Sequence, residues 1–210
     1  GIQALVPGDD VLVIDESVPR AAVRAMLTRG RGRITEATLD EFSDLVVVGR
    51  CGAGLDNIDV AAARQRGIAV VNAPGATTAA VAEHAVLLML GLARRVAELD
   101  AAVKAGRWSV RDAYTGAELR GKRLGVVGLG AIGRRVASLG RAFDLDVVYW
   151  SPTSRDDDLA RLELDDLLAT ADVVQLCVAL AADTVQLVDA RRLALMRPSA
   201  LLVNTSRGAI

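Results

Sequence analysis

The sequence has little of several features that would place it in a particular class of protein. No apolar run approaches the roughly 20 residues that a transmembrane helix needs. The longest such run, residues 85–93, is typical of a buried helix. The 25 basic and 26 acidic side chains leave a net charge of −1, which gives no reason to expect binding to nucleic acid or to a membrane surface. We therefore expect a soluble cytoplasmic protein.

Cysteine and histidine are also scarce, and the N-terminus has no charged region followed by an apolar one. The two cysteines, Cys51 and Cys177, lack the spacing of metal ligands or of a disulfide framework, so no metal site is expected. No signal peptide is predicted. The single histidine, His84, lies in a helical pattern, where we expect it to be packed and hydrogen-bonded. The chain begins with Gly1 rather than Met, which is consistent with processing or with a fragment.

Apolar residues, by contrast, make up 52% of the sequence, and their spacing alternates between strand and helix patterns. Because strands alternate with helices, we expect an α/β fold with a mostly parallel sheet covered on both faces. The second half is predicted to be Rossmann-like and doubly wound, and the first half to be a smaller α/β unit. Strands are predicted at residues 10–14, 23–28, 45–49, 68–71, 124–127, 146–150, 173–178 and 201–204, and helices at 35–42, 60–66, 132–143, 164–169 and 190–195.

Residues 77–104 form the longest helical pattern in the chain. Val81, Ala85, Leu88 and Leu92 recur on one face, and so many of their neighbours are apolar that the helix is expected to be buried nearly all round. Such a helix suits a hinge between domains or an interface between subunits. We therefore expect a homodimer that forms through this segment.

A glycine-rich turn after the strand at 124–127 is the main indication of a ligand. Gly128, Gly130 and Gly133 have G-x-G-x-x-G spacing, and an amphipathic helix follows at once. This order of strand, turn and helix is typical of a dinucleotide site, where backbone N–H groups face a pyrophosphate. Cofactor contacts are therefore expected from Gly128, Gly130, Ala131, Ile132 and Gly133. The alternative is a tight turn that binds nothing.

Five stretches of the chain together resemble one family. They are residues 50–59, 67–75, 80–84, 116–133 and 202–208. In this order they are similar to the D-isomer-specific 2-hydroxyacid dehydrogenases, which include phosphoglycerate dehydrogenase and glyoxylate/hydroxypyruvate reductase. The resemblance implies that residues 1–75 form the N-terminal part of a smaller, flavodoxin-like substrate-binding domain. It also implies a dinucleotide-binding Rossmann domain over residues 76–210, incomplete at its C-terminus.

The same resemblance implies roles for substrate-binding residues. Backbone N–H groups of Ala53 and Gly54 would bind the substrate carboxylate, and Arg207 would bind the substrate and polarise its carbonyl. Arg29 is either a contact for a charged substrate tail or a plain loop charge. The family's catalytic Glu and His lie downstream of the arginine motif, so they are expected after Ile210.

The choice of cofactor depends on the end of the strand at 146–150. An Asp or Glu there normally accepts hydrogen bonds from the adenosine ribose, but this chain has Ser151, with Thr153 and Arg155 following. Three hydroxyls and an arginine favour NADP over NAD, and the acids at 156–158 oppose it. The resemblance also places a loop that begins at Cys177 beside the cofactor.

Further contacts are expected from Val178 and Thr205. The family usually has prolines where Ala179 and Ala182 stand, with a threonine between them at Ala181, so this loop is expected to be looser. The favoured function is an NAD(P)-dependent oxidoreductase that interconverts a small 2-oxoacid and a D-2-hydroxyacid. The alternatives are a non-catalytic dinucleotide-binding regulatory or scaffold protein, like the C-terminal-binding corepressors, and an inactive fragment.

Overall fold

The computed structural model describes residues 19–29 and 32–210. The chain divides into two compact units, Gly1–Ala76 and Thr77–Ile210. The strand expected at residues 10–14 lies outside the described residues. Within the described part of the chain, no helix is long and apolar enough to cross a membrane.

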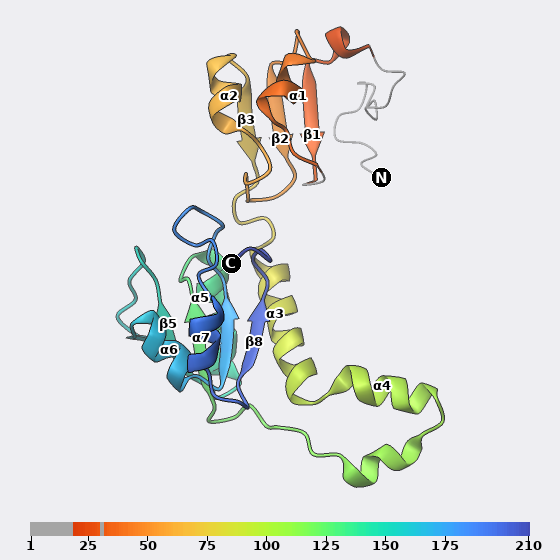
Figure 1. Ribbon diagram of the computed structural model, residues 1–210, viewed down its shortest axis with the longest axis vertical. Helices are drawn as coiled ribbons and strands as arrows, with labels where there is room; N and C mark the ends of the chain where they lie inside the picture. Colours follow the sequence, from red (N-terminus) through yellow and green to blue (C-terminus); the bar gives the residue numbers. More distant parts are fainter. Residues whose placement is uncertain (1–18, 30–31) are drawn as a thin grey trace. The chain divides into compact units, whose positions relative to one another are not determined.

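The first unit is built on a parallel sheet of three strands in the order β1-β2-β3 (Figure 1). Two short helices, α1 and α2, pack over the face that carries Met26 and Val48. Both helices begin at the caps that favour them, because Thr35 Oγ1 accepts from Thr38 N at 3.3 Å and Asp59 Oδ1 accepts from Ala62 N at 2.9 Å. The elements are η1 (Arg20–Ala22), β1 (Ala25–Thr28), α1 (Glu36–Asp40), β2 (Val47–Arg50), α2 (Val60–Gln65) and β3 (Ala69–Asn72).

The second unit contains a five-stranded sheet in the order β6-β5-β4-β7-β8, with every pair parallel. The predicted α/β class with a Rossmann-like sheet is therefore confirmed. The strands are β4 (Arg123–Val127), β5 (Asp146–Trp150), β6 (Ala160–Arg161), β7 (Val173–Leu176) and β8 (Leu201–Asn204). Only β6 was not predicted, since a strand of two residues has no period to detect.

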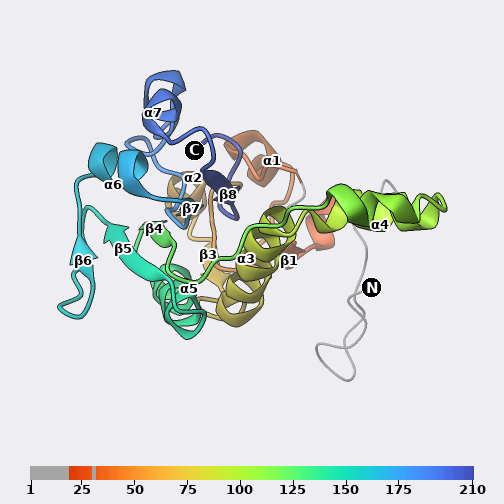
Figure 2. The same cartoon turned by 90° about the horizontal axis from the view of Figure 1, so that it is seen from below.

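Helices cover both faces of this sheet (Figures 1 and 2). Leu124 and Val126 pack in one buried cluster with α3 and α5, whereas Val127 and Val174 pack in another with α6. Successive strand residues point to opposite faces, so a sheet covered on both sides needs apolar residues at nearly every position. The covering helices are α5 (Ala131–Ala142), α6 (Leu164–Thr170) and α7 (Ala190–Leu195), together with α3.

The prediction of a single long helix over residues 77–104 is wrong, because the chain forms two helices there. α3 spans Thr78–Ala93 and α4 spans Val96–Lys104, with Arg95 between them in the left-handed region at φ 51°. The carbonyl groups of Ala93 and Arg94 would accept from the next turn if the helix continued, but they accept hydrogen bonds from residues further along the chain. Ala117 N donates to Ala93 O at 2.8 Å, and the Tyr114 hydroxyl donates to Arg94 O at 3.0 Å.

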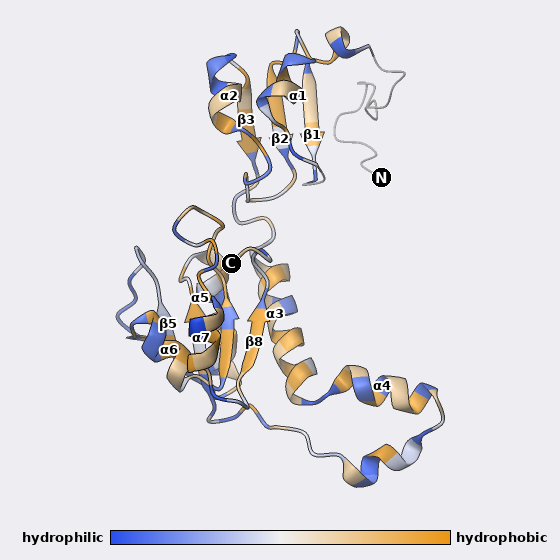
Figure 3. Ribbon diagram, viewed as in Figure 1, coloured by the Kyte–Doolittle hydropathy of each residue, from blue (hydrophilic) through white to orange (hydrophobic). Residues whose placement is uncertain are grey.

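The expectation that this segment is buried nearly all round is also wrong. Ala82, Ala85 and Met89 form the buried stripe of α3, but Leu87 is 62% exposed. His84 is exposed too, and it makes no hydrogen bond to another described residue, so its predicted packing is wrong. Nearly every position of α3 is apolar, as Figure 3 shows, so the sequence carries no contrast that would identify the buried face.

Beyond α3, the chain leaves the sheet before it returns as β4. In Figure 1, α4 extends away from the sheet, and the 3-10 helix η2 (Trp108–Ala113) begins the return. Apolar side chains are exposed on α4 and η2, among them Val96, Val103 and Trp108.

Candidate functional site

The glycine turn after β4 lies where the ends of two neighbouring strands meet. Gly128 has a φ of +98°, in the region that favours glycine. A Cβ atom there would lie 2.9 Å from the carbonyl carbon of Cys177 and from the nitrogen of Val178. The turn and the end of β7 are thus in direct backbone contact. This is the point of the sheet where the strand order reverses, and ligands of open α/β sheets bind there.

The two other glycines have different surroundings. A Cβ atom on Gly133 would collide with the carbonyl oxygen of Gly128, so this glycine lets α5 pack against the turn. Gly130, the residue before α5, has open space where its Cβ would stand. The first turn of α5, which includes Ala131 and Ile132, contains no acid and has no side-chain cap. Free N–H groups beside open space fit the pyrophosphate of a dinucleotide.

The end of β5 is polar and closely hydrogen-bonded. Ser151 is only 3% exposed, and its Oγ accepts from Ser154 N at 3.1 Å. The carbonyl oxygen of Ser151 accepts from Arg155 Nη1 at 3.4 Å and from Arg161 Nη2 at 3.3 Å. Two guanidinium groups therefore converge where an acid is usual, and Thr153 is exposed beside them.

The acidic residues that oppose NADP have partners of their own. Arg134 Nη1 lies 2.7 Å from Asp156 Oδ2, so the nearest acid after Arg155 is paired with a different arginine. Neither Arg134 nor Arg161 was predicted from the sequence as a site residue. Arg134 follows Gly133 directly in the first turn of α5, which was the available signal. Arg161 lies on the two-residue strand β6, so no sequence pattern marked it.

The carboxyl ends of β7 and β8 are joined by side chains. Gln175 is fully buried, and its Nε2 donates to Thr205 Oγ1 at 2.8 Å and to Leu176 O at 2.9 Å. Ser206 Oγ donates to the same Leu176 carbonyl at 3.1 Å. Thr205 is thereby brought beside Cys177, Val178 and the glycine turn. Gln175 was missed, since a single polar residue in an apolar strand gives no sign of its partner.

The backbone around Arg207 is fixed by the asparagine that ends β8. Asn204 Oδ1 accepts from Ser206 N, and Asn204 Nδ2 donates to Arg207 O, both at 2.8 Å. The Arg207 side chain is exposed, and its Nη1 donates to Ser206 O at 2.9 Å. A guanidinium held at the carboxyl edge of the sheet is suited to bind a carboxylate or a carbonyl oxygen.

Cys177 is not a reactive thiol. Burial raises its pKa to about 11, against a smaller lowering by the Gln175 side chain. The thiol is therefore protonated at neutral pH, and it contributes a neutral surface to the site rather than a nucleophile.

The loop after Cys177 has internal support that the sequence analysis did not anticipate. Thr184 is buried, and its Oγ1 accepts from Ala181 N at 2.8 Å while lying 2.7 Å from Ala179 O, to which it donates. The hydroxyl of Thr184 thus bridges two of the positions that lack the family's usual residues. The predicted looseness of this loop stays a prediction.

In the first unit, the loop after β2 presents unused backbone donors. Gly52 has a φ of +155°, its carbonyl accepts from Ala73 N, and Asn72 Nδ2 donates to Ala53 O at 2.7 Å. The N–H groups of Ala53 and Gly54 have no acceptor among the residues that the structure describes. Successive free N–H groups in a tight turn can bind an anion.

Two arginines lie at the same edge of the first sheet. Arg29 follows β1 directly and is exposed. Arg50 ends β2 in register with Thr28, and its Nη1 donates to Cys51 O at 2.7 Å. Its Nε is buried without a partner among the described residues, and the guanidinium covers Gly52. Arg50 was missed, although a charge at the end of a strand, beside a glycine loop, was a usable signal.

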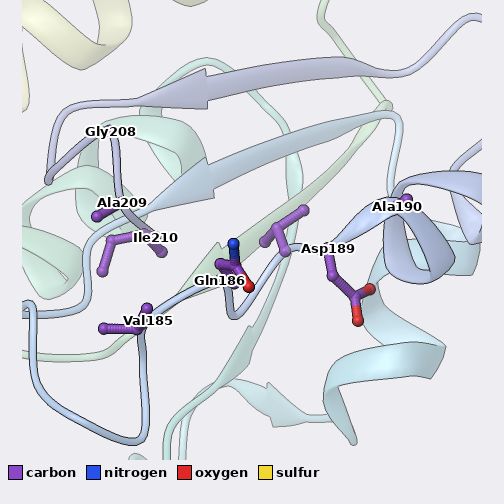
Figure 4. A pocket seen from close by; sticks show the side chains of 8 residues that line it. Val185, Gln186, Asp189, Ala190, Gly208, Ala209 and Ile210 are labelled. Atoms are coloured by element: carbon purple, nitrogen blue, oxygen red, sulfur yellow. The ribbon is translucent and has the colours of Figure 1, made fainter.

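A pocket of about 460 Å³ lies in the second unit just after Arg207 (Figure 4). It is lined by the segment before α7 and by the last residues of the chain, which are joined by hydrogen bonds from Gln186 N to Ala209 O and from Val188 N to Ile210 O. Its carboxylate, Asp189, already accepts from Arg192 N as the cap of α7. None of the predicted site residues lines this pocket.

The sequence of the chain is similar to those of known proteins along most of its length. It is 37% identical to a D-3-phosphoglycerate dehydrogenase of Archaeoglobus fulgidus over 89% of this chain and 36% of the relative. It is 36% identical to a hydroxypyruvate reductase of Thermotoga maritima over 89% of this chain and 61% of the relative. The chain thus spans between about a third and three fifths of these relatives.

Among solved structures, a D-lactate dehydrogenase of Aquifex aeolicus in complex with NAD and lactic acid superposes with a TM-score of 0.84. The two share 30% sequence identity over 92% of this chain and 60% of the other. Residues 86–210 match the family model described as "D-isomer specific 2-hydroxyacid dehydrogenase, NAD binding domain". The chain therefore belongs to the family of D-isomer-specific 2-hydroxyacid dehydrogenases.

Proposed function

We propose that the protein interconverts a small 2-oxoacid and the corresponding D-2-hydroxyacid, with a nicotinamide dinucleotide as the hydride carrier. The observation that carries this proposal is a site of the right chemistry in each unit. The second unit has open space at the start of α5 for a pyrophosphate. In the first unit, the N–H groups of Ala53 and Gly54 have no acceptor among the described residues, and they suit a carboxylate.

In this proposal, residues 1–75 form the substrate-binding domain and residues 76–210 the dinucleotide-binding domain. Ala53 and Gly54 hold the substrate carboxylate, while Arg207 orients the substrate and polarises its carbonyl group. Arg29 contacts a charged substrate tail. When bound, the dinucleotide supplies the hydride; in the family, the proton donor lies downstream of the arginine motif.

The direct test follows oxidation of NADH and NADPH with glyoxylate, hydroxypyruvate and pyruvate. We expect oxidation that depends on a 2-oxoacid, and a loss of at least about 100-fold in kcat/KM for Arg207→Gln, in line with removal of one oriented donor to a developing oxyanion. Arg197→Gln is the matched control, because Arg197 pairs with Asp172, whose other oxygen accepts from the first residue of β4, at the opposite edge of the sheet. Dinucleotide binding without turnover of any 2-oxoacid would instead favour a regulatory or scaffold protein.

We also propose that NADPH is preferred to NADH. Ser151 replaces the acid that would repel a 2′-phosphate, and the guanidinium groups of Arg155 and Arg161 converge on its carbonyl oxygen. The pairing of Asp156 with Arg134 supports this preference, because it leaves Arg155 less opposed. Titration with both reduced dinucleotides tests the proposal, and tighter binding of NADH would refute it.

We further propose a cytoplasmic homodimer that forms through the segment α3–α4. The support for the dimer is the set of exposed apolar side chains on this segment and on η2. Exposed groups of this kind mark interaction surfaces in soluble proteins. They are Leu87, Leu92, Val96, Val103 and Trp108.

A further inference from the structure

The order of strands determines which half of a dinucleotide meets β7 and β8. The pyrophosphate fits at the start of α5, and the residue that contacts the adenosine ribose stands at the end of β5. Since β5 and β7 lie on opposite sides of β4, the nicotinamide half of a bound dinucleotide would extend over the carboxyl ends of β7 and β8. Thr205, directly after β8, therefore lies on the nicotinamide side.

Gln175 is an unusual residue for the centre of a buried parallel strand. Its exposure is 0%, and all its neighbours in β7 are apolar. Its Nε2 has two acceptors, Thr205 Oγ1 and Leu176 O, while its Oε1 has no partner in the part of the chain that the structure describes. An unsatisfied buried oxygen is costly, and the two hydrogen bonds that the amide nitrogen donates offset this cost.

The orientation of the Gln175 amide is fixed by its neighbours. If the amide were turned over, its oxygen would face the Leu176 carbonyl, and two acceptors would meet. The Nε2 therefore donates, and Thr205 Oγ1 must accept. A hydroxyl that accepts in this way still has its own proton to donate. Thr205 is only half-buried, and no described residue accepts that proton.

We propose that Gln175 is a positioning residue that turns the Thr205 hydroxyl into a directed hydrogen-bond donor for an acceptor oxygen on the nicotinamide side. Two oxygens share this chemistry: the carboxamide oxygen of the nicotinamide and an oxygen of the 2-oxoacid. The inference rests on the proposed use of a nicotinamide dinucleotide, but it does not require turnover.

The first experiment compares Thr205→Val with Thr205→Ser by calorimetry. The probes are NADH and NADPH, each against the matching ADP-ribose compound that lacks the nicotinamide ring, and then oxamate in the presence of saturating dinucleotide. We expect Thr205→Val to weaken dinucleotide binding, or oxamate binding, by roughly three- to tenfold, the worth of one hydrogen bond. Thr205→Ser keeps the hydroxyl and restores most of the affinity.

The probes separate the two sources of the acceptor oxygen. A loss confined to the dinucleotide, with ADP-ribose unaffected, identifies the carboxamide, and a loss confined to oxamate identifies the substrate. An equal loss for ADP-ribose, or no loss for any probe, overturns the proposal. Thr170→Val is the matched control, because Thr170 Oγ1 donates to Asp166 O at the opposite end of the strands, and all affinities should be unchanged.

The second experiment tests the role of Gln175 with Gln175→Met, a substitution of similar volume. The Leu176 carbonyl keeps its bond from Ser206, and the unsatisfied oxygen disappears, so the melting temperature should stay within a few degrees. Affinity for the affected probe should fall by about two- to fivefold. On the Thr205→Val background the same substitution should have no further effect; losses that multiply would show that Gln175 does not act through Thr205.

These outcomes are separable from a failure of the proposed function. If the wild-type protein binds dinucleotide but reduces no 2-oxoacid, the proposed activity fails, and the carboxamide arm of this inference can still be measured. If Thr205→Val alters neither dinucleotide nor oxamate binding while the wild type turns over a 2-oxoacid, the activity stands and the inference fails.

Discussion

Gly130 and Gly133 stand three residues apart but differ in what a methyl group would meet. At Gly130 it would enter open space, where the pyrophosphate fits, and at Gly133 it would collide with the Gly128 carbonyl. We therefore predict that Gly130→Ala keeps the wild-type melting temperature but weakens dinucleotide binding by ~10-fold or more. Gly133→Ala should lose about 1–3 kcal/mol of unfolding free energy.

Thermal unfolding and dinucleotide titration on both variants check this pair. Gly116→Ala would be a poor control, since a Cβ atom there would meet the Tyr114 ring. Gly91→Ala is suitable, because it lies on α3 with open space at its Cβ position. If Gly130→Ala bound dinucleotide like the wild type, the open space at the start of α5 would not be the pyrophosphate site.

Ser151 is the residue that decides between the two dinucleotides in the proposed function. Ser151→Asp places a carboxylate where a 2′-phosphate would lie, and its oxygens can still accept from Ser154 N. We predict that the ratio of the Kd for NADPH to that for NADH rises by at least about tenfold, because like charges near a surface repel by this much or more. The neutral Ser151→Asn is the matched control, and an equal shift in both variants would exclude a charge effect.

At the scale of elements, α6 and α7 are joined by one carboxylate. Asp165 Oδ2 lies 2.7 Å from Arg191 Nη1, and Asp165 Oδ1 lies 2.8 Å from Arg192 Nε. These hydrogen bonds lower the pKa of Asp165 from its ordinary 3.8 to about 2. A depressed carboxyl pKa stabilises the fold above the unfolded value, and this stabilisation is lost as the pH falls through the folded value.

We therefore predict that Asp165→Asn lowers the melting temperature at pH 7, by a small amount because the carboxylate is exposed. The difference from wild type should stay constant down to about pH 4 and then shrink towards pH 2. Asp166→Asn is the control, since the Asp166 carboxylate has no partner among the described residues. A difference that persists unchanged at pH 2 would contradict the role of the charge.

An element is predicted well when residues close to it in the sequence determine its ends, and poorly when distant residues do. β5, α7 and β8 match their predicted ranges because local turn residues and caps end them, such as Asp189 at the start of α7. The break between α3 and α4 depends on Tyr114 and Ala117, about 20 residues further on, which no local pattern reveals. Propensity is overridden in such places by contacts distant in sequence.

The residues of the candidate site also differ in whether the sequence alone could identify them. The glycines were identifiable because their spacing is a property of the chain alone, and Arg207 because residues 202–208 resemble a motif of a known family. Gln175 and Arg50 were not, because each acts through partners that only folding supplies: Thr205 for the first, and the turn at Gly52 for the second. The exposure of His84 was missed for a related reason, since the apolar pattern of α3 does not distinguish its faces.

At the scale of the whole molecule, the second unit has exposed apolar side chains, and these form the contact of the proposed homodimer. Trp108 and Leu87 are both 62% exposed, and Val96 is 53% exposed. In the proposed homodimer these residues are covered. We predict that Leu87→Asp with Val96→Asp shifts the sedimentation of the protein from dimer to monomer, because burying an unpaired charge in an apolar contact is costly.

Leu193→Asp with Leu195→Asp provides the control, because these exposed residues lie on α7, away from α3 and α4. This control should sediment like the wild type. A wild-type protein that sediments as a monomer at micromolar concentration would rule out the proposed dimer.

If the chain acts as proposed, the position of β4 between β5 and β7 has a consequence for how its cofactor preference can change. In the proposed function, the residues that select the adenosine end of the dinucleotide lie around Ser151 and Arg161, whereas Gln175 and Thr205 lie across β4 from them. No hydrogen bond or ion pair joins the two groups among the residues that the structure describes, and free-energy effects of well-separated, non-contacting sites generally add. Substitutions on the β5 side of β4 can therefore change the cofactor preference while the residues on the β7 side stay the same, in natural evolution or in protein engineering.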